Sequence, residues 1–410
     1  MRIAYLTQSY PPMISGAALV VENLAKGMAA SGHQVLVIAA SDTSQTYKVE
    51  EGNLTILRLK SVHNPTRVGQ RFTPYSRRSV TNALHKFRPE TIHSHEPMPI
   101  SLPAIRYAGE MNVPTIVTIH QLPPTATRQL PGPMQVGMEK LLWSYGRWYT
   151  QKFTALITPT ETTSLQVRKI LGRPVNTISN GIDLQTFHPP LPNEDGVALR
   201  KKYDLPPEIP ILLHVGRLDP DKNVDRVIQA AALALAGNNA HLLIVGDGLR
   251  KPSLMKLCES LDIADRVHFT GFISTEQGLP EIYRIARLFI TASEIETQGL
   301  VLLEAAASGL PIVAVRATCI PEIVHDGVNG FLAEPGSIES LSKGIGILLK
   351  DGSQMARMGN ASLAIAQKHD TRFTIEAHEK LYYQLVEEQG HAVYRARPEE
   401  RQPVKEGLRP

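Results

Sequence analysis

Short apolar segments recur along the first half of the chain, and polar or amphipathic segments separate them. The apolar segments span residues 2–7, 34–40, 91–93, 115–119 and 155–158. Residues 16–31 lie between the first two and repeat apolar side chains at helical spacing, with Leu19, Leu24 and Met28 on one stripe. Apolar strands that alternate with helices predict a parallel sheet that helices cover on both faces.

The pattern stops at residues 188–193, where His-Pro-Pro-Leu-Pro-Asn forms a proline-rich linker, and then starts again. The new apolar segments span residues 211–215, 241–245, 266–269, 288–291 and 311–315. Two such halves predict an α/β chain of two Rossmann-like, doubly wound domains with parallel sheets that face a cleft. Ligands are then expected in the cleft, at the carboxyl ends of the strands.

The same pattern suggests where each domain begins and ends. We expect an N-terminal domain over residues 1–188, a linker region over 189–209 and a C-terminal domain over 210–367. A helix near 368–388 would complete the N-terminal domain. Few apolar residues follow Gln389, so residues 389–410 are predicted to be disordered.

Composition narrows the class of protein. A chain of 410 residues exceeds a single typical core, which agrees with two domains. The net charge of +4 is low for a nucleic-acid-binding protein. Cys258 and Cys319 lack metal-ligand spacing and indicate reduced thiols. Neither a signal peptide nor a membrane-spanning segment is evident, so we expect a cytoplasmic protein, either free or peripheral on the inner face of the membrane.

Two glutamates flank a predicted strand-to-helix turn in the second half. Glu296 lies in the loop before the helix, and Glu304 is expected about two turns inside it. The residues between them that would line the turn are Thr297, Gln298, Gly299 and Leu300. The free N–H groups and partial positive charge of a helix N-terminus suit a phosphate. The two carboxylates could then hold hydroxyl groups at both ends of a diphosphate-linked molecule, as a nucleotide-sugar requires.

Each glutamate also has a simpler explanation. Glu304 could be neutralised by a structural cation, because a carboxylate inside an apolar helix should not be buried without a partner. Glu296 could serve only as a negative charge that is favourable near the helix N-terminus.

Two cations follow the predicted strand 211–215. Gly216 permits close approach of the backbone, Arg217 offers a planar fork to phosphate oxygens, and Lys222 offers a mobile point charge. The two cations could neutralise a diphosphate leaving group without a metal. On their own they are more simply solvated loop cations, but Glu296 and Glu304 in the same half favour the phosphate role.

Glycine turns follow the next two strands. Gly246 and Asp247 form a tight turn that could admit a nucleotide, and Gly271 and Phe272 could present backbone groups to its base. Taken alone, ordinary turn chemistry is the simpler explanation of both.

In the first half, Gly16 closes the loop after the first strand and could bring backbone N–H groups to a phosphate. The loop lacks the three spaced glycines of a dinucleotide-binding protein, which argues against a nicotinamide dehydrogenase. His120 ends a predicted strand and could contact a sugar hydroxyl or help an acceptor lose its proton; a structural role is equally open. His93 and His95 have no third ligand at a convincing spacing, so we expect no metal. We also expect no cofactor, since the nucleotide-sugar would be a substrate.

Together these motifs resemble the retaining glycosyltransferases of the GT-B fold, in glycosyltransferase family 4. The resemblance runs from Met1 to about Val386, and the motifs are specific only in combination. Further matching segments are Asn180-Gly181-Ile182-Asp183 and Pro321-Glu322-Ile323-Val324. The resemblance implies that the protein moves a hexose from a nucleotide-sugar to a hydroxyl acceptor, with no metal in the catalytic step.

The resemblance also implies a role for each candidate residue. In that family, the residues that match Arg217 and Lys222 hold the donor diphosphate. The glutamate that matches Glu304 binds the ribose hydroxyls. The residues that match Glu296 and His120 approach the donor sugar, His120 from the other domain.

Two motifs depart from the family pattern. Thr297-Gln298-Gly299 stands where many relatives have Gly-Phe-Gly, and Thr318-Cys319-Ile320 stands where many have Gly-Gly before Pro-Glu-Ile-Val. The run Glu-Thr-Gln-Gly-Leu resembles the subgroup that glucosylates diacylglycerol, which implies UDP-glucose and a membrane lipid such as diacylglycerol or a glycolipid. A soluble sugar, a polysaccharide precursor or an inositol-type acceptor stays open. So do a sugar isomerase or phosphorylase of this fold and a non-catalytic nucleotide-sugar-binding protein.

A basic segment of the first domain partly supports a membrane acceptor. The segment contains Arg67, Arg71, Arg77, Arg78, Lys86 and Arg88, interleaved with Phe72 and Tyr75. Such a surface could sit on anionic headgroups, although a solvated face is equally open.

Both tryptophans of the chain lie in residues 139–153. There Leu141, Tyr145, Trp148 and Tyr149 form a helical stripe, with Trp143 off the stripe. A stripe of this kind is more often core than membrane anchor, so we expect it to be buried.

Overall fold

A computed structural model describes residues 1–13, 15–63, 71–74, 76–128, 130–192, 194 and 196–396 of the chain. The N-terminal half forms an eight-stranded sheet in the order β10-β9-β8-β7-β1-β2-β4-β3. Neighbouring strands run parallel, except that β3 pairs antiparallel with β4 at one edge. The strands are β1 (Arg2–Thr7), β2 (Gln34–Ala40), β3 (Tyr47–Glu51), β4 (Leu54–Leu59), β7 (Thr91–Ser94), β8 (Thr115–Thr118), β9 (Ala155–Thr158) and β10 (Asn176–Thr177).

The C-terminal half forms a six-stranded sheet in the order β13-β12-β11-β14-β15-β16, and its neighbours all pair in parallel. Its strands are β11 (Ile211–Val215), β12 (His241–Val245), β13 (Val267–Gly271), β14 (Leu288–Ile290), β15 (Ile312–Val315) and β16 (Gly330–Ala333). A two-stranded ribbon of β5 (Val62–His63) and β6 (Arg71–Phe72) lies outside both sheets. The two halves are therefore the doubly wound domains that the sequence predicts.

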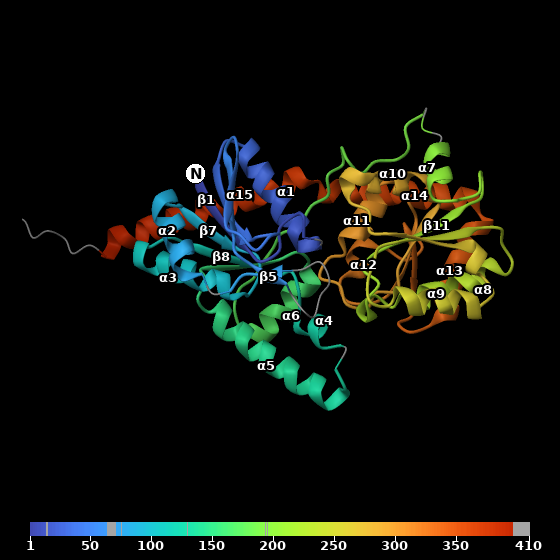
Figure 1. The fold of residues 1–410 in the computed structure, drawn as a ribbon, viewed down its shortest axis with the longest axis horizontal. Coiled ribbons are helices and arrows are strands. Elements are labelled where there is room, and N and C mark those ends of the chain that lie inside the picture. Colours follow the sequence, from blue (N-terminus) through green and yellow to red (C-terminus); the bar gives the residue numbers. More distant parts are fainter. Residues whose placement is uncertain are drawn as a thin grey trace, which may run out of the picture.

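Helices cover both sheets (Figure 1). Those of the N-terminal half are α1 (Gly16–Ala30), α2 (Arg77–Phe87), α3 (Leu102–Met111), α4 (Pro123–Thr127), α5 (Gly132–Thr150) and α6 (Glu161–Leu171). Those of the C-terminal half are α7 (Val197–Lys202), α8 (Val224–Leu235), α9 (Lys251–Ser260), α10 (Leu279–Ile285), α11 (Leu300–Ala307), α12 (Ile320–Ile323), α13 (Ile338–Lys350) and α14 (Gly352–Ala366). Within the described ranges, no helix has both the length and the apolar character to cross a bilayer.

The last helix, α15 (Thr371–Ala396), returns to the N-terminal domain and packs beside α1 (Figure 1). Tyr382 of α15 is fully buried, and its hydroxyl lies 3.3 Å from that of Tyr5 and 2.7 Å from Nδ1 of His93. The helix continues past Gln389, where the sequence predicts disorder to begin, and residues 397–410 of that predicted tail lie outside the described residues.

Each face of the N-terminal sheet has its own core. Val21, Leu24 and Met28 of α1 pack on one face together with Tyr382 of α15. Side chains of α2 and α3, among them Leu84, pack on the other face. Because helices bury both faces, the central strands β1 and β2 consist mostly of apolar residues, which is why the sequence pattern identifies them.

The sequence misses one edge element and wrongly predicts that a helical stripe is buried. The sequence does not predict the hairpin strand β3, because this edge strand is largely exposed and reads Tyr-Lys-Val-Glu-Glu. The helical stripe of α5 is not buried throughout, since Leu141 and Trp148 are exposed while Tyr149 is buried. Trp143, which lies off the stripe, packs against the core instead. The spacing of apolar residues in the sequence shows where a stripe lies on a helix. The stripe is buried only if another element packs against it.

Candidate active site

The carboxyl ends of β11, β12 and β13 are tied together by backbone hydrogen bonds. The N–H of Gly216 donates to the carbonyl of Val245 at 3.0 Å, and that of Gly246 to the carbonyl of Gly271 at 2.8 Å. Gly246 has a φ of +143°, and a Cβ at this position would lie 1.9 Å from the carbonyl oxygen of Gly216. Only glycine fits here, so the three predicted donor-binding loops form one compact surface.

The two predicted phosphate-binding cations lie on the first of these loops, and carboxylates neutralise both. Arg217 is hydrogen-bonded to Asp219 and, at 2.8 Å, to Asp221. Nζ of Lys222 lies 2.5 Å from Oε1 of Glu296, and both side chains are largely buried. The structure therefore brings Lys222 and Glu296, which are distant in sequence, into direct contact. An anionic ligand at this surface would compete with the carboxylates for both cations.

Glu304 lies on α11, which begins after Gly299, a residue with a φ of +78°. Because the helix starts at Leu300, Glu304 sits just over one turn inside it, not two as predicted from the sequence. Its carboxylate is buried and accepts a hydrogen bond of 2.7 Å from the hydroxyl of Tyr283 on α10. The protein group that contacts this carboxylate is thus the phenol of Tyr283. Burial raises the pKa of Glu304 to about 7, although the Tyr283 hydrogen bond lowers it.

The segment between the two glutamates contacts the N-terminal domain. The hydroxyl of Thr297 donates to the carbonyl of His120 at 2.8 Å. Oε1 of Gln298 accepts from the N–H of Asn180 at 2.8 Å, and its Nε2 donates to Oγ of Ser179 at 2.7 Å. We call this set of contacts between the two domains the domain junction. Two residues predicted to bind donor therefore hold the domains together in this structure.

Gly16 also faces the domain junction. Its helix, α1, is capped by Ser15, whose Oγ accepts from the N–H of Ala18 at 3.1 Å. A Cβ on Gly16 would lie 3.4 Å from Cδ1 of Leu300, so the N-termini of α1 and α11 meet across the junction. Two helix N-termini from different domains offer free N–H groups at one place.

His120 is half-buried and belongs to a set of stacked histidine rings in the N-terminal domain, the others of which are buried. Its Nε2 lies 3.0 Å from Nδ1 of His95, and the two rings stack with centroids 5.3 Å apart. His95 stacks in turn on His93, and His93 on His378 of α15. Burial, and to a lesser degree the charge of His378, lowers the pKa of His120 to about 4, so its ring is neutral at neutral pH. In the described part of the chain no group of histidine, cysteine and acidic residues is arranged to hold a metal ion.

Comparison with known proteins gives two adjoining family matches. Residues 14–186 match the family described as Glycosyltransferase Family 4, and residues 197–364 match Glycosyl transferases group 1. The two matches together take in most of the chain and meet at the predicted linker. The chain belongs to the GT-B glycosyltransferases. This agrees with the resemblance drawn from its motifs.

Individual proteins are similar over nearly the whole length. The alpha-monoglucosyldiacylglycerol synthase of Acholeplasma laidlawii is 27% identical over 344 residues, which is 80% of this chain and 84% of that protein. A GDP-mannose-dependent alpha-(1-6)-phosphatidylinositol dimannoside mannosyltransferase of Mycobacterium tuberculosis is 28% identical over 326 residues, which is 79% of this chain and 82% of that protein. Among solved structures, sucrose-phosphate synthase from Thermosynechococcus elongatus superposes with a TM-score of 0.78 at 20% identity over 94% of this chain and 98% of that chain.

Two contacts of this glycosyltransferase lie beyond what sequence reasoning found. Glu322 of the second domain accepts hydrogen bonds from the N–H groups of Glu161, at 3.0 Å, and Thr162, at 2.7 Å, and so caps α6 of the first domain. Arg128, between α4 and α5, pairs with Glu294 at 2.5 Å. No spacing in the sequence signals either contact, because each joins residues from separate domains.

The predicted membrane surface of the glycosyltransferase is only partly on the outside. Arg71 is buried, contrary to expectation, and hydrogen-bonds Oγ of Ser61 at 2.7 Å and Nε2 of His63 at 2.8 Å. An arginine satisfied in this way stabilises the β5–β6 ribbon and cannot reach a headgroup. Arg77 and Arg78 are exposed at the start of α2, whereas Arg67 lies outside the described residues.

Two of the residues predicted to bind the donor, Asp247 and Phe272, are exposed to solvent. Asp247 is exposed, and its Oδ1 accepts from the N–H of Gly248 at 2.8 Å. Phe272 is exposed beside Gly271, at the edge of the compact loop surface. In the described part of the chain, neither residue forms a hydrogen bond to the N-terminal domain.

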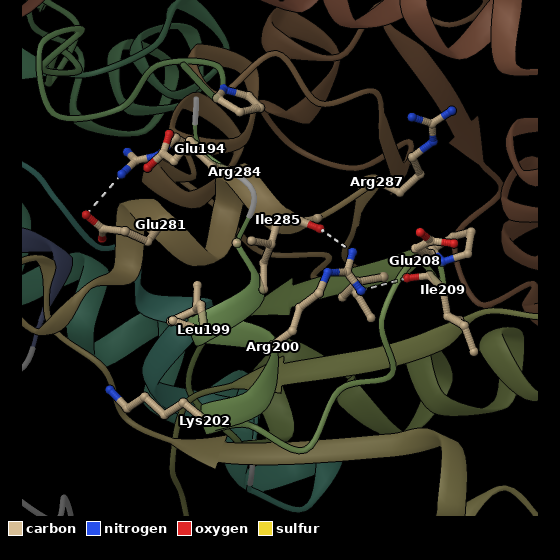
Figure 2. Close-up of a pocket in the computed structure, with 16 residues that line it drawn as sticks. Glu194, Leu199, Arg200, Lys202, Glu208, Ile209, Glu281, Arg284, Ile285 and Arg287 are labelled. Atoms are coloured by element: carbon tan, nitrogen blue, oxygen red, sulfur yellow. Dashed lines mark hydrogen bonds and ion pairs between the residues drawn. The ribbon is translucent and has the colours of Figure 1, made fainter. Parts of the chain in front are cut away.

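A pocket of the glycosyltransferase lies elsewhere, between the linker region, α7 and α10 (Figure 2). It includes Ile211, the first residue of β11, so it lies at the opposite end of that strand from Gly216. Arg200 is bound to the carbonyl of Ile209 at 2.9 Å, and Arg284 to Glu194 at 2.9 Å. Because these arginines are satisfied within the protein, and ligands of such sheets bind at the carboxyl ends, the pocket does not compete with the domain junction as the active site.

Proposed function

We propose that the protein is a retaining hexosyltransferase that moves a hexose, preferably glucose from UDP-glucose, to a hydroxyl group of a membrane lipid such as diacylglycerol or a glycolipid. The observation that carries the proposal is the direct contact of Lys222 with Glu296, next to Arg217 and opposite His120 of the other domain. A cationic pair beside a carboxylate, at the junction of two domains, suits a donor that carries both a diphosphate and a sugar.

In this proposal the donor diphosphate takes the place of the carboxylates that now neutralise the cations. Arg217 would release Asp219 and Asp221, and Lys222 would release Glu296. The freed Glu296 would then accept hydrogen bonds from the donor sugar. Glu304 would bind the ribose hydroxyls, and Gly246 and Gly271 would let the nucleotide approach the backbone.

The chemical step is a transfer between two oxygen atoms. The acceptor oxygen forms a bond to the anomeric carbon as the bond from that carbon to the diphosphate oxygen breaks. The acceptor proton passes to the leaving diphosphate, so no external oxidant, reductant or metal is needed. Attack from the face that the diphosphate leaves preserves the anomeric configuration. Arg217, Lys222 and the N-terminus of α11 would stabilise the charge that grows on the diphosphate.

The Acholeplasma relative named above, a glucosyldiacylglycerol synthase, supports the lipid acceptor and the glucose donor. The Mycobacterium relative uses GDP-mannose and an inositol lipid according to its name, so the donor base and the acceptor need a direct test. The test is a panel of UDP- and GDP-sugars incubated with lipid extract and with soluble sugars, read by mass spectrometry and by the anomeric coupling constant in NMR.

We expect a hexosylated lipid from UDP-glucose with retained configuration. A product from GDP-mannose only, or on a soluble sugar only, would replace the donor or the acceptor in the proposal. Binding of donor without any product would favour the non-catalytic alternative, and an inverted product would overturn the retaining mechanism.

A further inference from the structure

Helix α5 carries an apolar stripe that the described chain leaves largely exposed, with Tyr145 alone packed partly against the core. The stripe consists of Met134, Met138, Leu141, Tyr145 and Trp148, at alternating spacings of four and three residues. Met134, Leu141 and Trp148 expose 60%, 62% and 47% of their surface. Exposed apolar side chains are ordinary when scattered, but a contiguous helical stripe marks a surface that binds something.

The helix is held in a fixed orientation at its C-terminal end. Tyr149 is fully buried, Trp143 packs against the core beside it, and the hydroxyl of Tyr145 donates to the carbonyl of Pro97 at 2.9 Å. Figure 1 shows α5 along the outer edge of the N-terminal domain, with no other element beyond it in this view. The protein therefore presents the stripe outward on a rigid base.

The charged residues beside the stripe indicate what binds to it. Lys140 and Arg147 lie about a third of a turn to one side of the stripe, at the angle from which long cationic side chains reach the headgroups above a helix that lies in a bilayer surface. Nζ of Lys152 lies 4.4 Å from the ring centroid of Trp148. Glu139 is the single acidic residue of α5, and Thr127 and Gln135 bind its carboxylate.

A second copy of the chain fits the same surface less well. Antiparallel pairing of two α5 helices through their stripes would bring the Lys140 and Arg147 flank of one copy toward the same flank of the other. The positive charges of the two copies would then face each other, and neither stripe contains an acidic residue that could neutralise them. An anionic lipid surface has the opposite charge and has no such conflict.

We propose that α5 is the membrane-docking element of the protein, with the stripe inserted among the acyl chains and Lys140, Arg147 and Lys152 at anionic headgroups. The proposal rests on the proposed function for its purpose, since a lipid acceptor must be reached in a bilayer. The helix also follows the site closely along the chain, since His120 lies two residues after β8 and α4 then precedes α5, and Arg128 between α4 and α5 pairs with Glu294 of the other domain.

The test measures co-sedimentation with vesicles of phosphatidylglycerol and phosphatidylcholine in equal parts, and with vesicles of phosphatidylcholine alone. We expect the wild-type protein to bind the anionic vesicles, and the double variant Met138→Asp/Leu141→Asp to bind them about tenfold less. Lys140→Glu/Arg147→Glu should reduce only the anionic preference. The control is Leu233→Asp, which changes a leucine that is also exposed, by 55%, on α8 of the other domain.

Three results would overturn the docking proposal: equal binding by the wild-type protein and the stripe variant, loss of binding only in Arg77→Glu/Arg78→Glu on α2, or a wild-type dimer that Leu141→Asp converts to a monomer. Circular dichroism of each variant checks that it folds. Donor binding and transfer to a detergent-dispersed lipid should be unchanged in the stripe variant. If no lipid is ever glycosylated but vesicle binding still depends on α5, the proposed function fails and the docking surface stands.

Discussion

Glu304 is a carboxyl group whose protonation is set by two neighbouring effects. Burial raises its pKa to about 7, and the hydrogen bond from Tyr283 lowers it. The ionised form accepts hydrogen bonds from hydroxyl groups, so we expect kcat/KM for the donor to rise as the pH rises through about 7. Tyr283→Phe removes an interaction that favours the charged form and should move this rise to higher pH.

Rate profiles between about pH 5.5 and about pH 9 measure that shift. The control is Tyr383→Phe, on the exposed side of α15, which should leave the profile in place. A profile of Tyr283→Phe that coincides with the wild-type profile would show that the ionisation of Glu304 does not govern donor use.

Lys222 is the cation that contacts Glu296 directly. If it stabilises the leaving diphosphate, Lys222→Ala should lower kcat by about 10²- to 10³-fold. Its melting temperature should change little, because the side chain forms an ion pair with Glu296 and is not part of the apolar core. Steady-state kinetics measure the effect, with Lys343→Ala on the exposed side of α13 as the control. Normal transfer by Lys222→Ala would remove this residue from the site.

At the scale of elements, the sequence predicts a strand well where helices bury both of its faces. β1 and β2 begin and end where the apolar runs do. Edge elements are predicted poorly, because their side chains need not be apolar. β3 is charged and exposed, and β10 is only two residues long. The stripe predicted at Leu141, Tyr145, Trp148 and Tyr149 of α5 shows the converse, since a correct helical period says nothing about whether the side chains are covered.

Glu322 is a helix cap supplied by one domain to an element of the other. Glu322→Ala removes both acceptors from the first N–H groups of α6, so we expect a loss of about 1 kcal/mol in the free energy of unfolding. Urea unfolding measures it, and Glu376→Ala on the exposed side of α15 serves as the control. An unchanged midpoint would mean that water replaces the cap without loss.

At the scale of the whole molecule, the sequence predicts which site residues lie together only when those residues are close to one another along the chain. Arg217 and Lys222 share one loop, and Glu296 and Glu304 share one turn and helix, so their spacing already indicates a common place. The partnership of Glu304 with Tyr283, and the contacts of Thr297 and Gln298 with the N-terminal domain, arise only when the chain folds. Sequence spacing contains no information about such contacts.

The charges of the site also predict how the enzyme responds to chelators. Arg217 and Lys222 provide positive charge for a diphosphate without a bound ion, so transfer should continue at an unchanged rate in excess EDTA. Rates measured after dialysis, with and without added Mg²⁺, test this. A loss of activity that Mg²⁺ restores would mean that the two side chains are not sufficient to neutralise the leaving group.

The return of α15 to the N-terminal domain has a consequence for biosynthesis. Tyr382, which is buried against Tyr5 and His93, is translated long after the strands that it covers. As the chain emerges from the ribosome, one face of the first sheet therefore stays partly exposed until α15 has been synthesised. The second domain contains its own core and does not depend on α15 in this way. The first sheet, although it is synthesised first, can therefore be fully covered only after the second domain has been made.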